Sequence, residues 1–136
     1  PLIQGNAAVE ADQRQRRTTV FGVGHQMPKV WQFKVSVGQF LPDDDPRAAR
    51  AFIVLGSRVK EELFPGSSPL GKFVRVGGSR FRVIGVMESK GQMLGFDLDD
   101  AVYINSFGCM VVGHNIYQWR VVLAGAAHKL GILEMQ

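Results

Sequence analysis

The sequence contains few of the residues from which a catalytic or metal centre is usually built. Cys109 is the only cysteine among 136 residues, so no disulfide can form within the chain. Its neighbours are apolar, and reactive thiols need an accessible, electropositive setting, so we interpret it as a buried, inert thiol. His25, His114 and His128 lie far apart and follow no zinc-ligand spacing. No serine stands in a G-x-S-x-G motif, so neither a metal nor a serine hydrolase is indicated.

Long runs of one residue class are also missing. No apolar segment approaches the roughly 20 residues that span a bilayer. The formal net charge is +4, but the chain has no long run of Lys or Arg. Arg14, Arg16 and Arg17 form a small basic group, which we interpret as a solvated hairpin tip. A small basic β-domain that binds nucleic acid through this hairpin is the second interpretation.

Two acidic groups could suggest a calcium site. They are Asp43-Asp44-Asp45 and Asp97-x-Asp99-Asp100, and calcium takes several oxygen ligands. Neither has the glycine and glutamate positions of an EF-hand loop. We therefore expect solvated loops, or acids that cap the turn that follows them, and we predict no metal and no cofactor.

The hydrophobic pattern predicts an α+β fold that is rich in mixed and antiparallel β-sheet, with short helices. The hydrophobic content is 46% and the charged content 21%, which is typical of a single folded domain. We expect two helices, at 26–31 and at 57–64 with Ser57 as the N-cap, and a loop over 88–97. Period-2 alternation and short apolar runs predict strands over 5–10, 17–23, 34–37, 51–55, 72–76, 80–87, 101–104 and 117–123.

The segment Gly66–Lys72 spells G-x-x-x-x-G-K, the phosphate-binding loop of nucleotide hydrolases without its final Ser or Thr, which is replaced by Phe73. A phosphate-binding loop follows a buried strand and opens a helix. Here the expected helix, 57–64, precedes the segment and a strand, 73–76, follows it. Pro69 also lacks the N–H that such a loop would offer. The order of elements therefore predicts a structural turn.

Three ordered segments resemble the MacB-like periplasmic core domain of ABC-transporter permeases of the MacB/FtsX type. One runs from Phe81 to Val86 as F-x-V-I-G-V, and another from Lys90 to Asp100 as K-G-x-x-x-G-x-D-x-D-D before a strand. Gln39 stands where the family has an Arg in its G-R-F stretch. The resemblance covers residues 18–125, whereas 126–136 match loosely. The most specific segment is L-F-P-G-x-x-P-L-G-K, formed by Leu63, Phe64, Pro65, Gly66, Pro69, Leu70, Gly71 and Lys72.

The resemblance implies a non-enzymatic domain outside the membrane, between the first two transmembrane helices of a permease in the cell inner membrane. It further implies that the domain transmits conformational change in ATP-driven export, or in the transport of lipoproteins, peptides or drugs. The implied partners are an ABC ATPase subunit or domain, a second permease copy, and a periplasmic adaptor or substrate protein, with no nucleic acid. We interpret both ends of the sequence as truncated, and we expect residues 1–136 to be one extracytoplasmic domain taken from a longer protein.

One apolar loop is a candidate contact surface. Met93, Leu94 and Phe96 lie in a polar stretch next to glycines. Apolar loop residues either pack into the core or form a contact with another molecule. The sequence leaves both interpretations open. If these residues form a contact surface, we expect the loop to bind a partner subunit or the second permease copy.

Overall fold

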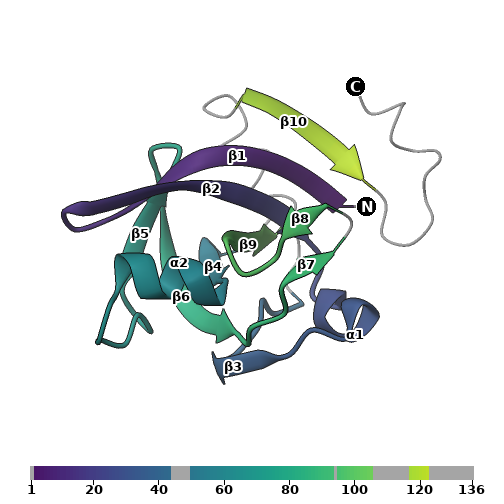
Figure 1. Cartoon of the computed structure of the whole chain (residues 1–136), viewed down its shortest axis with the longest axis horizontal. Helices are drawn as coiled ribbons and strands as arrows, with labels where there is room; N and C mark the ends of the chain where they lie inside the picture. Colours follow the sequence, from purple (N-terminus) through teal and green to yellow (C-terminus); the bar gives the residue numbers. More distant parts are fainter. Residues whose placement is uncertain (1, 44–49, 94, 106–116, 123–136) are drawn as a thin grey trace.

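The computed structural model describes residues 2–43, 50–93, 95–105 and 117–122 (Figure 1). Within these ranges the chain is mostly β-strand, with two short helices, α1 (Met27–Trp31) and α2 (Ser57–Leu63). The fold class predicted from the sequence is confirmed. The strands are β1 (Leu2–Ala11), β2 (Arg14–Val23), β3 (Val35–Gly38), β4 (Phe52–Leu55), β5 (Phe73–Val76), β6 (Ser79–Met87), β7 (Gln92–Met93), β8 (Phe96–Asp97), β9 (Ala101–Asn105) and β10 (Tyr117–Val122).

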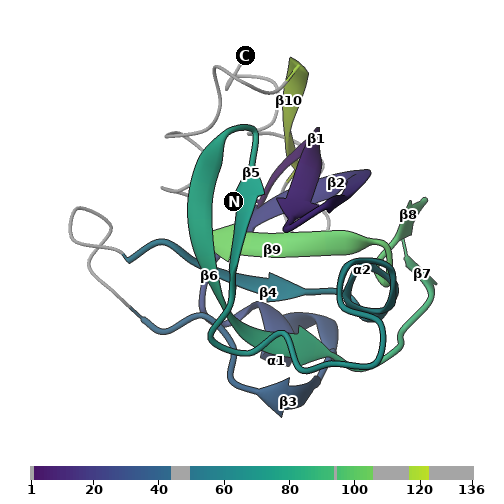
Figure 2. The same cartoon turned by 90° about the vertical axis from the view of Figure 1, so that its left-hand side faces the viewer.

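The main sheet closes on itself. Its pairing order is β10-β1-β2-β9-β4-β6-β3, and β5 pairs with both β1 and β6. The strands β1, β2, β9, β4, β6 and β5 therefore form a closed ring, with β10 and β3 attached outside it (Figure 2). The β2–β9 and β4–β6 pairs are parallel and the other pairs are antiparallel. Closure removes free edges from the ring strands, which is how small barrels avoid edge-to-edge association.

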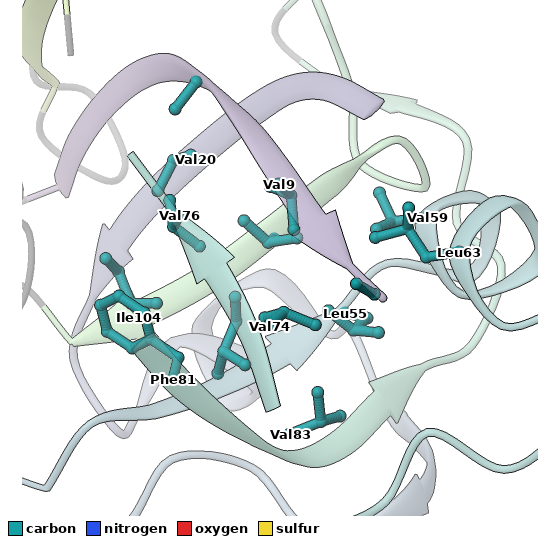
Figure 3. Packing of buried hydrophobic residues seen from close by; sticks show 14 of the residues in the cluster. Val9, Val20, Leu55, Val59, Leu63, Val74, Val76, Phe81, Val83 and Ile104 are labelled. Carbon is teal, nitrogen blue, oxygen red and sulfur yellow. The ribbon is translucent and has the colours of Figure 1, made fainter. Parts of the chain in front are cut away.

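The interior of the ring is filled by aliphatic side chains that alternate along the strands. Val9, Leu55, Val74 and Val83 are almost completely buried in this cluster, and α2 adds Val59 and Leu63 to it (Figure 3). Successive residues of a strand point to opposite faces, so the same strands present their other residues to the outside of the ring. Burial of each such side chain contributes about 1.5–3 kcal/mol, so this cluster is a large source of stability of the fold.

A second, aromatic cluster covers part of the outer face of the ring. Phe21 and Tyr103, on the neighbouring strands β2 and β9, stack with ring centroids 5.6 Å apart. Phe33, which follows α1, meets the edge of Tyr103 at 5.9 Å. Leu98 and Met87 are also buried in this layer. The sheet is thus packed on both faces where this layer covers it.

The structure corrects several details of the sequence prediction. Strands β1 and β2 are longer than expected, and their turn contains only Asp12 and Gln13. The segment 88–97 was predicted as a loop, but it contains the short β7–β8 pair. The prediction that Ser57 caps α2 is wrong. Gly56 is the N-cap residue and no side chain caps this helix. The main-chain carbonyl of Asp99 accepts the Arg58 N–H at 2.9 Å and takes the place of a capping hydroxyl.

Candidate interaction site

The segment Leu63–Lys72 forms the connection from α2 to β5. Its first two side chains, Leu63 and Phe64, are buried in the interior cluster, and Pro69 is also buried. Between them the chain turns at the exposed Gly66, whose φ of 73° lies in the left-handed region that favours glycine. Leu70 is 38% exposed although its side chain is large and apolar. The segment therefore anchors the end of α2 and turns the chain toward the sheet.

The main-chain amides of this turn are used within the protein. The N–H of Gly71 donates to Val83 O at 2.8 Å, and the N–H of Lys72 donates to Pro69 O at 3.0 Å. Ser67 N donates to Phe64 O, and Leu70 N donates to Ser68 Oγ. A phosphate-binding loop needs these groups to point at its ligand. The predicted order of helix, turn and strand is observed, and the geometry is that of a structural turn.

The acidic segment at residues 97–100 organises the loop that precedes it. The Asp99 carboxylate accepts hydrogen bonds from Lys90 N at 2.7 Å, Gly91 N at 3.1 Å and Ser89 Oγ at 3.0 Å. Asp97 Oδ1 accepts the Asp99 N–H at 3.1 Å, which is the cap of the following turn that the sequence predicted. These carboxylate oxygens are occupied by donors of the same loop. Among the described residues no group of three or more His, Cys, Asp or Glu could hold a metal ion.

Asp100 joins this loop to the β1–β2 hairpin. Its carboxylate accepts two hydrogen bonds from Arg16, from Nε at 2.8 Å and from Nη2 at 2.9 Å, and a third from Thr18 Oγ1 at 3.0 Å. The Arg16 guanidinium is the main cause that lowers the pKa of Asp100, and the bond to Asp100 raises the pKa of Arg16. Arg16 also lies 3.7 Å from Glu62. Arg16, one of the three arginines of the predicted basic hairpin, is therefore part of an internal ion pair.

The apolar loop residues lie against the aromatic cluster. Met93 and Phe96 are half-buried, and the Phe96 ring meets Phe21 edge-on at 5.4 Å. Trp31 of α1 meets the same Phe21 ring at 5.9 Å. Leu94 lies outside the described residues. Met93 and Phe96 thus use part of their surface in packing and leave part of it accessible.

A hollow of about 570 Å³ lies between the tip of the β1–β2 hairpin and the Leu63–Lys72 turn. Asp12 and Arg14 line it on one side, and Pro65, Ser67 and Lys72 line it on the other. The sequence separates these two segments by more than forty residues, so no local pattern could predict that they meet. His25 Nδ1 lies 3.5 Å from the exposed Asp43, while Cys109, His114, His128 and residues 44–45 lie outside the described residues.

Comparisons with known proteins connect this fold to one family. The family model of the MacB-like periplasmic core domain matches residues 1–128. The macrolide export ATP-binding/permease protein MacB of Marinobacter nauticus is 33% identical over 105 residues, which are 76% of this chain and 16% of that protein. The pyoverdine export ATP-binding/permease protein PvdT of Pseudomonas entomophila is 29% identical over 101 residues, covering 74% of this chain and 15% of that protein. The chain thus spans about one sixth of the length of these relatives.

Two solved structures share the fold. The extracellular domain of the noncanonic ABC-type transporter YknZ from Gram-positive bacteria aligns with a TM-score of 0.67 at 22% identity, over 87% of this chain and 61% of that one. The periplasmic region of MacB from Actinobacillus actinomycetemcomitans aligns with a TM-score of 0.66 at 24% identity, over 80% of this chain and 50% of that one. Within the described residues no helix has the length and apolar content to cross a bilayer. The family model covers most of the sequence, and the resemblance inferred from the three motifs is confirmed: this chain belongs to the family of MacB-like periplasmic core domains of ABC permeases.

Proposed function

We propose that this chain is the extracytoplasmic domain of an ABC-transporter permease, on the periplasmic side of the inner membrane, and that it transmits conformational change during ATP-driven transport. The observation that carries this proposal is the match to the periplasmic core domain over residues 1–128. The relatives named for macrolide and pyoverdine export support a role in export. The cargo in this proposal is a drug, a peptide or a lipoprotein.

In this proposal the domain itself catalyses no reaction. The relatives are ATP-binding/permease proteins, and this chain aligns with 16% of the first and 15% of the second. Hydrolysis of ATP is then the task of a separate domain or subunit on the other side of the membrane. The turn at Gly66–Lys72 supports this division, because its amides donate to the protein's own acceptors.

A domain that transmits movement must move as one body, and the structure offers a physical basis for this. The strands of the ring are hydrogen-bonded in a closed circuit. The loop before β9 ties other elements to that ring: Asp99 O accepts the Arg58 N–H of α2, and Lys90 Nζ donates to Gln32 O at the end of α1 at 2.9 Å. A force applied at either helix therefore reaches the ring through short, directional bonds.

The coupling is tested with the full-length transporter in lipid nanodiscs. Cys109 is first replaced by Ser, and Glu61→Cys then provides a spin-label site on α2, where the Glu61 side chain is 67% exposed. Pulsed electron resonance measures the distance between the labels of the two permease copies. We expect ATP with vanadate to shift this distance in the wild-type background but not in an ATPase-inactive variant. An identical distance distribution in all nucleotide states would contradict the transmitting role.

The β7–β8 loop is our candidate for the contact with a second permease copy or another partner subunit. Met93 and Phe96 are half-buried, so the Phe96→Ala and Met93→Ala variants lose packing as well as contact surface. Ile84→Ala is the matched control, because Ile84 packs against the same cluster from β6. We expect the loop variants to weaken complex assembly and transport more than the control does. Unchanged assembly and transport in both loop variants would end this assignment.

The residues of the Leu63–Lys72 segment have a structural role in the proposal. Leu63 and Phe64 hold the end of α2 in the interior cluster, and the turn that follows positions Lys72 beside the hairpin tip. The hollow between these two segments is a surface on which a periplasmic adaptor or substrate protein could rest. None of its lining residues belongs to β7 or β8, so the two candidate contacts can be mutated separately.

A further inference from the structure

Five side chains form a row of alternating arginine and phenylalanine on the outside of the ring. Phe73 of β5 pairs with Arg82 of β6, and Arg82 also pairs with Phe52 of β4. These three residues therefore lie side by side across three neighbouring strands, which Figure 2 shows next to one another. Their chain neighbours, such as Val74 and Val83, are buried in the interior cluster, so the row faces outward. We call Arg50, Phe52, Phe73, Arg80 and Arg82 the Arg/Phe row.

Two of the arginines are stacked on the rings of the row. The Arg80 Cζ atom lies 3.7 Å from the centroid of the Phe73 ring, and the Arg50 Cζ atom lies 4.8 Å from that of Phe52. Phe73 is 47% exposed although it is a large apolar side chain. A guanidinium stacked on a ring keeps its N–H groups at its edge, where they can donate to a ligand. The stacking therefore pre-orients Arg80 for hydrogen bonding.

Arg80 and Arg82 have no carboxylate partner among the residues that the structure describes: no ion pair or hydrogen bond from either side chain is found there. Two acidic residues lie at one end of the row. Glu10 pairs in register with Arg75, and Glu10 and Asp12 line a hollow of about 270 Å³ together with Phe73, Arg75 and Arg80. The cationic side of this face, around Arg80 and Arg82, is thus left with unused donors.

We propose that the Arg/Phe row binds a carboxylate-bearing, extended segment of a partner protein. The planar fork of Arg matches a carboxylate with two parallel hydrogen bonds, and Arg and aromatic residues dominate the strongest contacts in protein interfaces. Arg80 and Arg82 are two residues apart on one strand, so they lie about 7 Å apart along it. Acidic residues at alternate positions of an extended partner segment have the same spacing.

Two other classes of anionic partner fit the row less well. Single-stranded nucleic acid binds through bases that stack on free aromatic faces, whereas one face of Phe73 is covered by Arg80. Anionic membranes attract clusters of about 4–8 Lys and Arg, whereas Glu10 and Asp12 lie beside this row and the neighbouring Arg75 and offset part of their positive charge. This inference goes beyond the coupling role proposed above and does not depend on it, because binding by the chain alone tests it.

The test uses the 136-residue chain and a fluorescein-labelled peptide of alternating Glu and Thr, with a Gln-Thr peptide as the neutral probe. Fluorescence anisotropy at low and moderate salt measures binding. We expect the acidic peptide to bind in a salt-sensitive manner and the neutral peptide not to bind. The Arg80→Gln/Arg82→Gln variant should weaken binding about tenfold or more, because charge-assisted hydrogen bonds are lost.

Matched variants separate this site from the overall charge of the chain. Arg14→Gln/Arg17→Gln removes the same charge from the exposed hairpin tip and should leave the affinity unchanged. Arg80→Lys/Arg82→Lys keeps the charge and should still weaken binding, because Lys lacks the planar fork. Circular dichroism checks the fold of each variant. Absence of peptide binding at low salt, or equal weakening by the hairpin variant, would overturn the proposal. So would tighter, row-dependent binding to oligothymidylate or to phosphatidylglycerol vesicles.

Discussion

The substitution Gly56→Ala probes the junction between α2 and β9 directly. A Cβ at this position would lie 2.4 Å from Asp99 O, 2.7 Å from Ala101 O and 2.8 Å from Leu98 O. All three atoms belong to the main chain, so no side-chain rotation can relieve the contacts. The two segments must separate, which strains the Gly56 N–H bond to Ala101 O at 2.7 Å and the Arg58 N–H bond to Asp99 O at 2.9 Å.

The magnitude follows from these two effects. Overpacking of a tight site costs about 1–3 kcal/mol, and each lost hydrogen bond costs about 0.5–1.5 kcal/mol. We therefore expect Gly56→Ala to lower the free energy of unfolding by about 2–6 kcal/mol. Urea denaturation followed by tryptophan fluorescence and circular dichroism measures it. The matched control is Gly24→Ala, where a Cβ meets nothing within 4 Å and the change should be neutral or slightly stabilising. A loss below about 1 kcal/mol for Gly56→Ala would refute the reasoning.

Three further predictions concern the loop before β9 and the turn after α2. Asp100→Asn should cost about 1–2 kcal/mol at neutral pH in the same urea assay, because the bonds from Arg16 are weakened. Arg16 lowers the folded-state pKa of Asp100 below 3.8. The stability difference between wild type and this variant should therefore be complete above pH 3.8, and it should vanish as the pH falls through the folded-state pKa of Asp100. Tyr103→Phe removes the hydroxyl bond to Leu98 O at 2.7 Å and should cost about 1–2 kcal/mol. Burial raises the folded-state pKa of Tyr103 well above 10.0. Above pH 10.0 the unfolded chain therefore loses the Tyr103 proton before the folded chain does, so the wild type should lose more stability than this variant as the pH rises. Lys72→Ala should change stability by less than about 0.5 kcal/mol, and calorimetric titration with magnesium and ATP should give no binding heat for either protein.

The local elements were predictable because each depends on a short stretch of sequence. Alternation predicted the strands 72–76 and 80–87, and they are observed as the β5–β6 pair, with a register from Phe73↔Arg82 to Val76↔Ser79. The helix 57–64 was predicted from its apolar spacing and is observed as Ser57–Leu63. The order of helix, turn and strand around Gly66–Lys72 was predictable for the same reason.

The arrangement of those elements depended on contacts that no short window contains. The ring closes where Val9 pairs with Val76, a pairing between distant strands that alternation alone cannot select. Ser57 was expected to cap α2, but a carbonyl from Asp99, far along the chain, satisfies the helix instead. From the sequence we interpreted Arg16 as a solvated or nucleic-acid-binding residue, because its partner, Asp100, is 84 positions away. The hollow beside the Leu63–Lys72 turn is equally a product of distant segments.

The residues that reveal the family and the residues of the Arg/Phe row belong largely to different parts of the molecule. In the motif segments, the turn amides and the Asp97, Asp99 and Asp100 carboxylates are consumed by internal hydrogen bonds. Such groups specify the scaffold, and they have few donors or acceptors left for a partner. The Arg/Phe row has the opposite character. Of its residues only Arg82 falls within a family motif, at the unspecified position of that motif. In the part of the chain that the structure describes, the side chains of Arg80 and Arg82 donate no hydrogen bond to another residue. Specificity for a partner can therefore change on this face of the ring while the bonds that define the fold stay intact.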